Sequence, residues 1–256
     1  MDLYRSMTES LAGQDLVIWP EAAVPAPDDL VPDYLDDLRQ LARSLDTQLL
    51  VGILTHDEER DEYRNSLLAL GEPAGAYHKR HLVPFGEFFP VPDFIRAWLR
   101  MMSLPYSDIA PGPQRQRPLV ARGVALAPTI CYEDAYGAEQ LPFLPESGLL
   151  VSVSNDAWFG DTMAPHQHLQ IARMRALETG RYLVRSTNTG ITAIINEKGG
   201  LTAVAPQFKP FVLQGIARAF TGATPYVRGG NAPVLGICLL GVLGALLTAR
   251  QRALID

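Results

Sequence analysis

The residues with the clearest chemical potential surround one cysteine. Residues 124–130 form an apolar, strand-like run, and Cys131 follows at its end with Glu133 and Asp134 close behind. A cysteine at the end of a buried strand, with carboxylates beside it, stands where the nucleophile of an α/β enzyme is expected. The alternative for Cys131 alone is a small core residue, because free cysteine is among the most buried residue types. Two further stretches favour the nucleophile.

A thiol that attacks a carbonyl carbon needs a base to take its proton and a positive group or amide donors to stabilise the oxyanion. Glu21 follows the apolar run 14–20, and Lys79 lies in the loop 77–90, which its prolines and glycine make rigid. If the strands are parallel neighbours, both side chains meet Cys131 at one edge of a sheet. Taken singly, Glu21 fits a surface carboxylate and Lys79 a solvated charge. The three together indicate a catalytic site, in which Lys79 should favour the thiolate of Cys131.

Three motifs in fixed order carry a family resemblance. They are VIWPEAAVP with Glu21, HKRHLVPFGEFFP with Lys79 and Glu87, and TICYEDAYG with Cys131 and Glu133. Together they resemble the carbon–nitrogen hydrolase (nitrilase) superfamily, in which a Glu, a Lys and a Cys occur in this order. The SNDAWFG stretch at 154–160, the long motif at 166–190 and the TPY-R-GN run at 224–231 narrow the resemblance to the apolipoprotein N-acyltransferase family. The resemblance covers nearly the whole chain.

The resemblance implies a role for each matching residue. Glu21 is the general base, Cys131 takes an acyl chain from a phospholipid as a thioester, and Lys79 stabilises the oxyanion. The acyl chain then passes to the α-amino group of the diacylglyceryl-cysteine of an apolipoprotein, in a ping-pong scheme with no cofactor and no metal. Glu87 and Glu133 match supporting carboxylates. Their alternative role is structural, since each can fix Lys79 or a loop by hydrogen bonds.

The remaining sequence predicts an α/β fold. Apolar runs indicate strands, and helical spacing indicates helices. The expected strands are 14–20, 49–55, 65–70, 124–131, 149–154, 181–186, 191–196 and 212–217, and the expected helices are 32–45 and 165–180. Residues 94–102 suit either a short lipid-contacting lid or an ordinary amphipathic helix. The resemblance implies a nitrilase-like α-β-β-α sandwich.

Composition sets further bounds. The chain has 256 residues and a formal net charge of −6, which suits one large domain and argues against a nucleic-acid partner. Its two cysteines, Cys131 in the candidate site and Cys238 in an apolar tail, are not expected to form a disulfide. His166 and His168 are two positions apart, which is not one helical face, so a zinc site is not expected. Trp158 and Phe159 fit a pocket wall or the core.

The C-terminal region differs from the rest. Residues 232–249 carry no charge, and Arg250 and Arg252 follow. About 18 apolar residues suffice for a membrane span, and the basic end then lies in the cytoplasm. The alternative is a buried terminal core helix. The expected organisation is a catalytic domain at 1–222, a linker at 223–231, a transmembrane helix at 232–249 and a cytoplasmic tail at 250–256. The resemblance implies the bacterial inner membrane, with the catalytic domain on the periplasmic face.

The sequence also departs from the family pattern. The resembled enzymes carry a bundle of transmembrane helices before the hydrolase domain, and only about a dozen residues precede the first predicted strand here. We therefore expect a chain truncated at its N-terminus, without the first strand of the sandwich and with a neighbouring strand edge unpaired. Two alternatives stay open: a soluble-type amidase that uses the same Glu-Lys-Cys set on a small amide, and an inactive truncated fragment.

Overall fold

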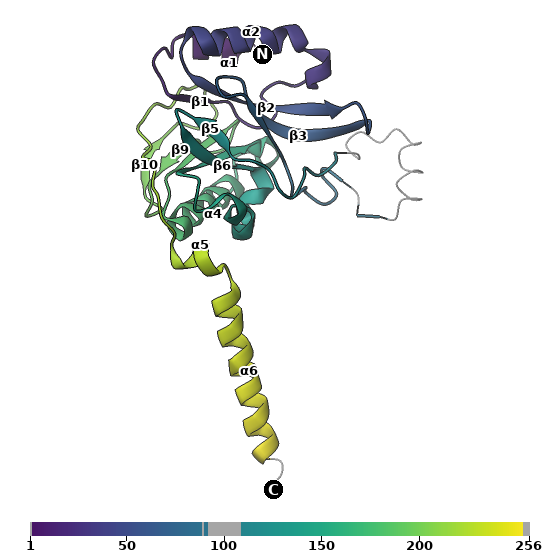
Figure 1. Cartoon of the computed structure of the whole chain (residues 1–256), viewed down its shortest axis with the longest axis vertical. Coiled ribbons are helices and arrows are strands. Elements are labelled where there is room, and N and C mark those ends of the chain that lie inside the picture. The colour runs from purple at the N-terminus through teal and green to yellow at the C-terminus, as the bar shows by residue number, and fades with distance from the viewer. Residues whose placement is uncertain (1, 89, 92–108, 253–256) are drawn as a thin grey trace.

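The structure is a computed structural model that describes residues 2–88, 90, 91 and 109–252. Two sheets stack face to face, and helices cover their outer sides (Figure 1). Helices α1 (Asp2–Glu9) and α2 (Pro32–Ser44) lie over the first sheet, and α4 (Ala164–Thr179) lies over the second. The predicted α-β-β-α sandwich is confirmed. Residues 94–102, predicted as a lid or helix, fall outside the described residues.

The two sheets differ in their strand directions. The first has the order β1-β2-β3-β4, with β1 parallel to β2 and the other pairs antiparallel, and comprises β1 (Leu16–Ile18), β2 (Gln48–Asp57), β3 (Glu62–Ala69) and β4 (Gly75–His78). The second has the order β10-β9-β8-β7-β6-β5 and comprises β5 (Leu119–Ala121), β6 (Val124–Ile130), β7 (Leu149–Ser154), β8 (Leu183–Thr187), β9 (Ala193–Ile195) and β10 (Leu201–Val204). Its three central strands, β6, β7 and β8, are parallel.

The local sequence accounts for the main elements. Every residue of β7 is buried, as a continuous apolar run between two covered faces requires. Pro32 opens α2, whose Leu35, Leu38 and Ala42 form the buried stripe. Gly180 ends α4 in the left-handed conformation, with φ 64°. These elements hold the ends of the strands, and therefore the candidate site, in fixed places.

One predicted strand is absent, and three strands of the structure were not predicted. The 212–217 segment is not a strand, because it pairs with neither sheet among the described residues and Ile216 in it is 82% exposed. The last strand is instead β10, which was not predicted and is only four residues long. β4 and β5 were missed for the same reason, since runs of three or four residues are too short to show a period.

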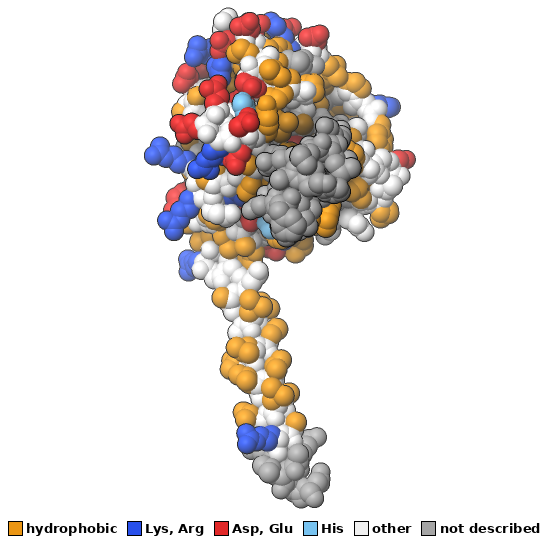
Figure 2. Space-filling view, turned by 90° about the vertical axis from the view of Figure 1, so that its right-hand side faces the viewer, with side chains coloured by type: hydrophobic (Ala, Val, Ile, Leu, Met, Phe, Trp, Pro, Cys, Tyr) orange, Lys and Arg blue, Asp and Glu red, His pale blue; other side chains and the backbone are white. Residues whose placement is uncertain are grey.

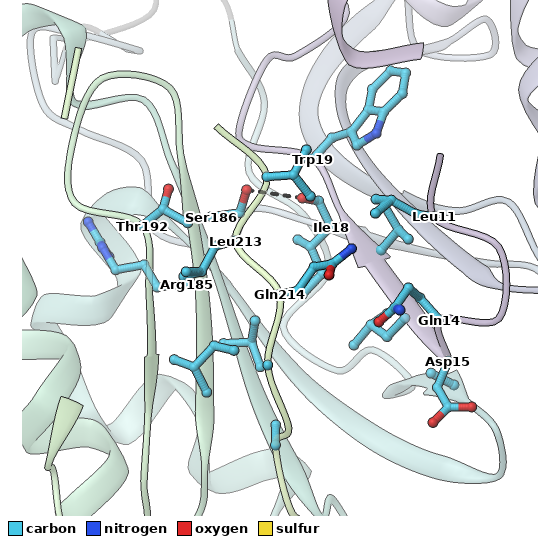
Figure 3. Close-up of a pocket in the computed structure, with 18 of the residues that line it drawn as sticks. Leu11, Gln14, Asp15, Ile18, Trp19, Arg185, Ser186, Thr192, Leu213 and Gln214 are labelled. Atoms are coloured by element: carbon cyan, nitrogen blue, oxygen red, sulfur yellow. Dashed lines mark hydrogen bonds between the residues drawn. The ribbon is translucent and has the colours of Figure 1, made fainter. Parts of the chain in front are cut away.

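The edge of the first sheet borders a cavity. β1 is the outermost strand of that sheet, and a cavity of about 440 Å³ separates it from the 211–219 segment. Figure 3 shows its walls, with Leu11 and Trp19 on one side and Leu213 on the other, and a hydrogen bond from Ser186 Oγ to the Ile18 carbonyl. The lining does not include Glu21, Lys79 or Cys131, so this cavity is separate from the candidate site.

The C-terminal helix stands away from the sandwich. After the short α5 (Pro225–Gly229), α6 (Ala232–Arg252) projects from the globular part, and hydrophobic side chains cover it (Figures 1 and 2). Residues 232–250 have a mean hydropathy of 2.2, and none of them is buried. By length and composition this helix can cross a membrane. The alternative of a buried terminal core helix is wrong.

Candidate active site

The three predicted catalytic residues come from two different sheets. Glu21 follows β1 and Lys79 directly follows β4, both in the first sheet, whereas Cys131 directly follows β6 in the second. The expectation that they meet at one edge of a single sheet is therefore wrong. They come together because the two sheets stack with these strand ends facing one another. The site lies between the layers, where side chains are shielded from solvent.

Lys79 is a buried cation held between two carboxylates. Its side chain is 1% exposed, and its Nζ lies 2.8 Å from Glu87 Oε1 and 3.4 Å from Glu21 Oε1. Burial opposes the charge, but Glu21 and Glu87 outweigh it and hold the pKa of Lys79 above its ordinary value. Lys79 is therefore a fixed positive charge at neutral pH.

Glu21 is held at both oxygens. Asn65 Nδ2 donates to Glu21 Oε1 at 2.7 Å and also to Glu87 at 3.2 Å, and the Asn155 backbone N–H donates to Glu21 Oε2 at 2.7 Å. A Cβ on Gly52 would lie 2.2 Å from the Pro20 carbonyl oxygen, so only glycine lets β2 approach this loop. Sequence reasoning missed Asn65, although an amide inside the apolar strand β3 was the available signal.

Cys131 has an unusual backbone conformation and a thiol with a raised pKa. It is the first residue of the 3-10 turn η2 (Cys131–Ala135), with φ 53°, in the left-handed region that non-glycine residues rarely adopt. Burial raises the pKa of its thiol to about 12, the charge of Glu21 adds to this effect, and Lys79 opposes it. Lys79 thus favours the thiolate as expected, but its effect on the pKa is smaller than the effect of burial. The thiol carries its proton at neutral pH, so attack on a carbonyl carbon requires a base.

Glu133 braces the site through the backbone. It is fully buried, and its oxygens accept hydrogen bonds from the backbone N–H groups of Ile130, Arg80 and His81 and from the hydroxyl of Tyr77. These contacts tie the chain on either side of Lys79 and Cys131 together. The geometry favours the structural alternative for Glu133, whereas Glu87 contacts Lys79 directly.

The buried Glu133 predicts how folding stability depends on pH. Burial raises the pKa of Glu133 from 4.5 to about 6. Between pH 4.5 and 6 the folded protein therefore retains a proton on Glu133 that the unfolded chain has lost. The corresponding stability is present below pH 4.5 and is lost as the pH rises through 6, by roughly 2 kcal/mol. We expect Glu133→Gln to remove this component. Unfolding of wild type and variant in detergent at pH 4 to 8 tests it, and equal pH dependence of the two proteins would contradict the assignment.

A second charged cluster lies beneath Cys131. Asp134 and Asp156 both bind the guanidinium of Arg185, at 2.8 and 3.1 Å, and His168 lies between the two carboxylates. Sequence reasoning missed these roles. The signal was an arginine inside the apolar run of β8, because a charge in a buried strand needs partners. His166, by contrast, is exposed, as expected for a residue off the buried face of α4.

Large apolar side chains near the site face solvent. Trp158 is 80% exposed, and Phe159, Met163 and Phe85 are exposed as well. Trp158 and Phe159 belong to the turn η5 (Asp156–Phe159), which begins just after the Asn155 amide that binds Glu21. The core alternative for Trp158 and Phe159 is wrong. Exposed apolar groups beside a polar site mark a surface suited to an apolar ligand.

Comparison with known proteins gives consistent results. The carbon-nitrogen hydrolase family model matches residues 1–226. A protein of Methylococcus capsulatus named apolipoprotein N-acyltransferase is 45% identical over 253 residues, which are 98% of this chain and 50% of that protein. A protein of Coxiella burnetii with the same name is 43% identical over 240 residues, which are 94% of this chain and 50% of that protein. The chain spans about half the length of the curated relatives it matches.

The fold is also similar to solved structures. A carbon-nitrogen hydrolase from Helicobacter pylori superposes with a TM-score of 0.58 at 16% identity, over 80% of this chain and 77% of that one. At this identity the similarity concerns the fold alone.

Proposed function

The chain belongs to the carbon-nitrogen hydrolase family, and we propose that it is an acyltransferase that carries an acyl chain from a phospholipid, through a Cys131 thioester, to the N-terminal diacylglyceryl-cysteine of apolipoproteins. The observation that carries the proposal is the buried Lys79, which lies between Glu21 and Glu87 and whose charge lowers the pKa of the protonated Cys131 thiol. The name shared by relatives at 43–45% identity, apolipoprotein N-acyltransferase, supplies the substrate class.

The first half-reaction forms the thioester. Glu21 takes the proton of the Cys131 thiol, and the sulfur attacks the ester carbonyl carbon of the phospholipid. Lys79 stabilises the oxyanion of the tetrahedral intermediate, and its fixed charge needs no rearrangement at that moment. When the intermediate collapses, the ester C–O bond breaks and Glu21 returns the proton to the leaving alkoxide. The products are the acyl-enzyme and a lysophospholipid.

The second half-reaction uses the same groups, and Cys131 is now the leaving group. The α-amino group of the acceptor attacks the thioester carbon, and Lys79 again stabilises the oxyanion. Glu21 accepts a proton from the attacking amine, the C–S bond breaks, and the thiolate of Cys131 recovers the proton. Supporting roles fall to Glu87, which fixes Lys79, and to Glu133, which fixes the backbone. The balance of the two steps needs neither a metal nor an organic cofactor.

The proposed setting is the bacterial inner membrane. Residues 1–222 form the catalytic domain, 223–231 a linker that includes α5, 232–249 the membrane span and 250–256 a cytoplasmic tail. Support comes from the exposed, uncharged residues 232–249 of α6 and from Arg250 and Arg252 at its end, since basic residues favour the cytoplasmic side. The catalytic domain then lies on the periplasmic face. Exposed apolar side chains such as Trp158 suit contact with lipid acyl chains.

The test supplies both substrates to the whole chain. The protein in detergent–phospholipid micelles receives a phospholipid with an alkyne-tagged acyl chain and a diacylglyceryl lipopeptide with a free α-amino group. We expect the tag to appear in amide linkage on the lipopeptide, with one lysophospholipid released per transfer, and no product from a lipopeptide whose amino group is acetylated. Gel mobility of the clicked lipopeptide and mass spectrometry measure the result.

Two other outcomes would favour other functions. Release of ammonia from a small amide, without acyl transfer, would favour the soluble-type amidase. No turnover and no reaction of Cys131 with alkylating reagents would favour an inactive fragment. The exposed apolar helix and the apolar surface near η5 give the amidase no additional support.

A further inference from the structure

The carbonyl group of Cys131 has a charged partner that the acyl-transfer chemistry does not use. His168, on α4, places its Nε2 3.2 Å from the carbonyl oxygen of Cys131 and 3.5 Å from Asp134 Oδ2. Its Nδ1 lies 2.9 Å from Asp156 Oδ1. The imidazole therefore bridges η2, which begins with Cys131, and η5, which follows β7.

These contacts define the protonation state of His168. A carbonyl oxygen accepts hydrogen bonds but cannot donate them, and the same holds for an ionised carboxylate. Both ring nitrogens therefore have to donate, which only the imidazolium does. The other charged group facing His168 is the guanidinium of Arg185, which binds Asp134 and Asp156. The two carboxylates and the two cations then balance in charge, and the side chains of Arg185, Asp134 and Asp156 are fully buried.

The remaining electrostatics agree with this state. Burial and the charge of Arg185 disfavour the imidazolium, but hydrogen bonds to Asp134 and Asp156 raise the pKa of His168 above its ordinary value. The pKa of Asp134 is lowered to about 2, because hydrogen bonds and the charges of His168 and Arg185 outweigh its burial. A Cβ on Gly190 would lie 2.1 Å from Asp156 Oδ2, so only glycine at this position leaves room for the Asp156 carboxylate in the cluster.

We propose that His168 is a positioning residue: as an imidazolium anchored by Asp134 and Asp156, it donates through Nε2 to the Cys131 carbonyl and holds Cys131 in the left-handed conformation that presents its thiol to Glu21 and Lys79. A φ of 53° is unfavourable for a residue with a Cβ, and a charge-assisted hydrogen bond to that residue's own carbonyl opposes relaxation. The kinetic consequence rests on the proposed function, whereas the protonation state and the hydrogen bond do not.

The direct test observes the bond in the whole chain. Protein labelled with ¹⁵N in histidine and with ¹³C in the cysteine carbonyl is studied by NMR in detergent micelles at pH 8. We expect His168 to show two protonated ring nitrogens at a pH where an ordinary histidine is neutral. The Cys131 carbonyl signal should shift in His168→Leu, return toward its wild-type position in His168→Gln, which keeps an N–H donor, and stay unchanged in His166→Leu.

The kinetic test uses the same variants. A nucleophile displaced by about 1 Å loses on the order of 100-fold in rate, so we expect His168→Leu to lower kcat by 10- to 100-fold with KM changed less than about 2-fold. His168→Gln should recover part of kcat, and His166→Leu should match wild type. A neutral His168 at pH 8, or an unmoved Cys131 carbonyl signal in His168→Leu, would overturn the proposal. If wild type shows no acyl transfer, the proposed function fails, and the NMR result still decides this proposal.

Discussion

Cys131→Ala should abolish acyl transfer, with a loss on the order of 10⁴-fold or more. In the proposed mechanism the sulfur of Cys131 holds the acyl chain between the two half-reactions, and alanine offers no substitute for it. Because Cys131 stands on a turn rather than inside a strand, and alanine is no larger than cysteine, the change should leave the fold intact. Thermal unfolding in detergent should therefore show two similar proteins, of which only wild type transfers acyl chains.

The intermediate gives a second, independent measurement. Wild type incubated with a phospholipid and no acceptor should carry one acyl chain that neutral hydroxylamine removes, as expected for a thioester. Peptide mass spectrometry should place it on Cys131. Cys238, in the exposed apolar α6, is the matched control, so Cys238→Ala should keep both the adduct and the activity. An adduct on Cys238, or full transfer by Cys131→Ala, would contradict the mechanism.

The sequence was most informative where a local pattern determines a local structure. The uncharged 232–249 run predicted α6, and the apolar run before Cys131 predicted β6. Glu21 and Cys131 were each predicted to follow a strand, and each does, whereas Lys79 was predicted to lie in a rigid loop and follows the strand β4, which was not predicted. The sequence did not reveal which sheet each strand joins, because pairing depends on contacts between distant segments. For that reason the expected single-sheet edge was wrong although its three residues were identified.

The polar residues around the site were harder to foresee. Asn65 and Arg185 lie among apolar residues on their strands. Their roles depend on partners far away in the sequence, such as Glu21 and Asp134. A buried charge predicts that a partner exists but does not identify it. His168 was considered only as a metal ligand and was set aside on spacing. Its contact with the Cys131 carbonyl requires the fold to be known.

Glu21 and Lys79 should have opposite effects on the Cys131 thiol and the same effect on turnover. Burial is the main cause of the raised pKa of Cys131, the charge of Glu21 raises it further, and Lys79 lowers it. Glu21→Gln should therefore lower the pKa of the thiol, and Lys79→Met should raise it. Both should slow acyl transfer, by roughly 10²- to 10⁴-fold for loss of the base and roughly 10²- to 10³-fold for loss of the oxyanion partner.

The two effects can be measured separately. In a Cys238→Ala background, alkylation by iodoacetamide at pH 9 reports the thiolate fraction of Cys131 alone. Lys79→Met leaves Glu21 and Glu87 buried without a cation, which threatens folding. The double variant Lys79→Met with Glu87→Gln avoids this problem, because one positive and one negative charge are removed together. Its cluster keeps the net charge of wild type.

The opposite changes in alkylation rate test the roles assigned to Glu21 and Lys79. Relative to the Cys238→Ala protein, Glu21→Gln should be alkylated faster and the Lys79→Met, Glu87→Gln protein more slowly, while both transfer acyl chains more slowly. If thiolate fraction limited the reaction, Glu21→Gln would be the faster enzyme, so its low activity together with a more reactive thiol would identify proton transfer as the role of Glu21. Slower alkylation of Glu21→Gln would instead mean that its carboxylate does not raise the pKa of the thiol, and the charge arrangement inferred for the site would be wrong.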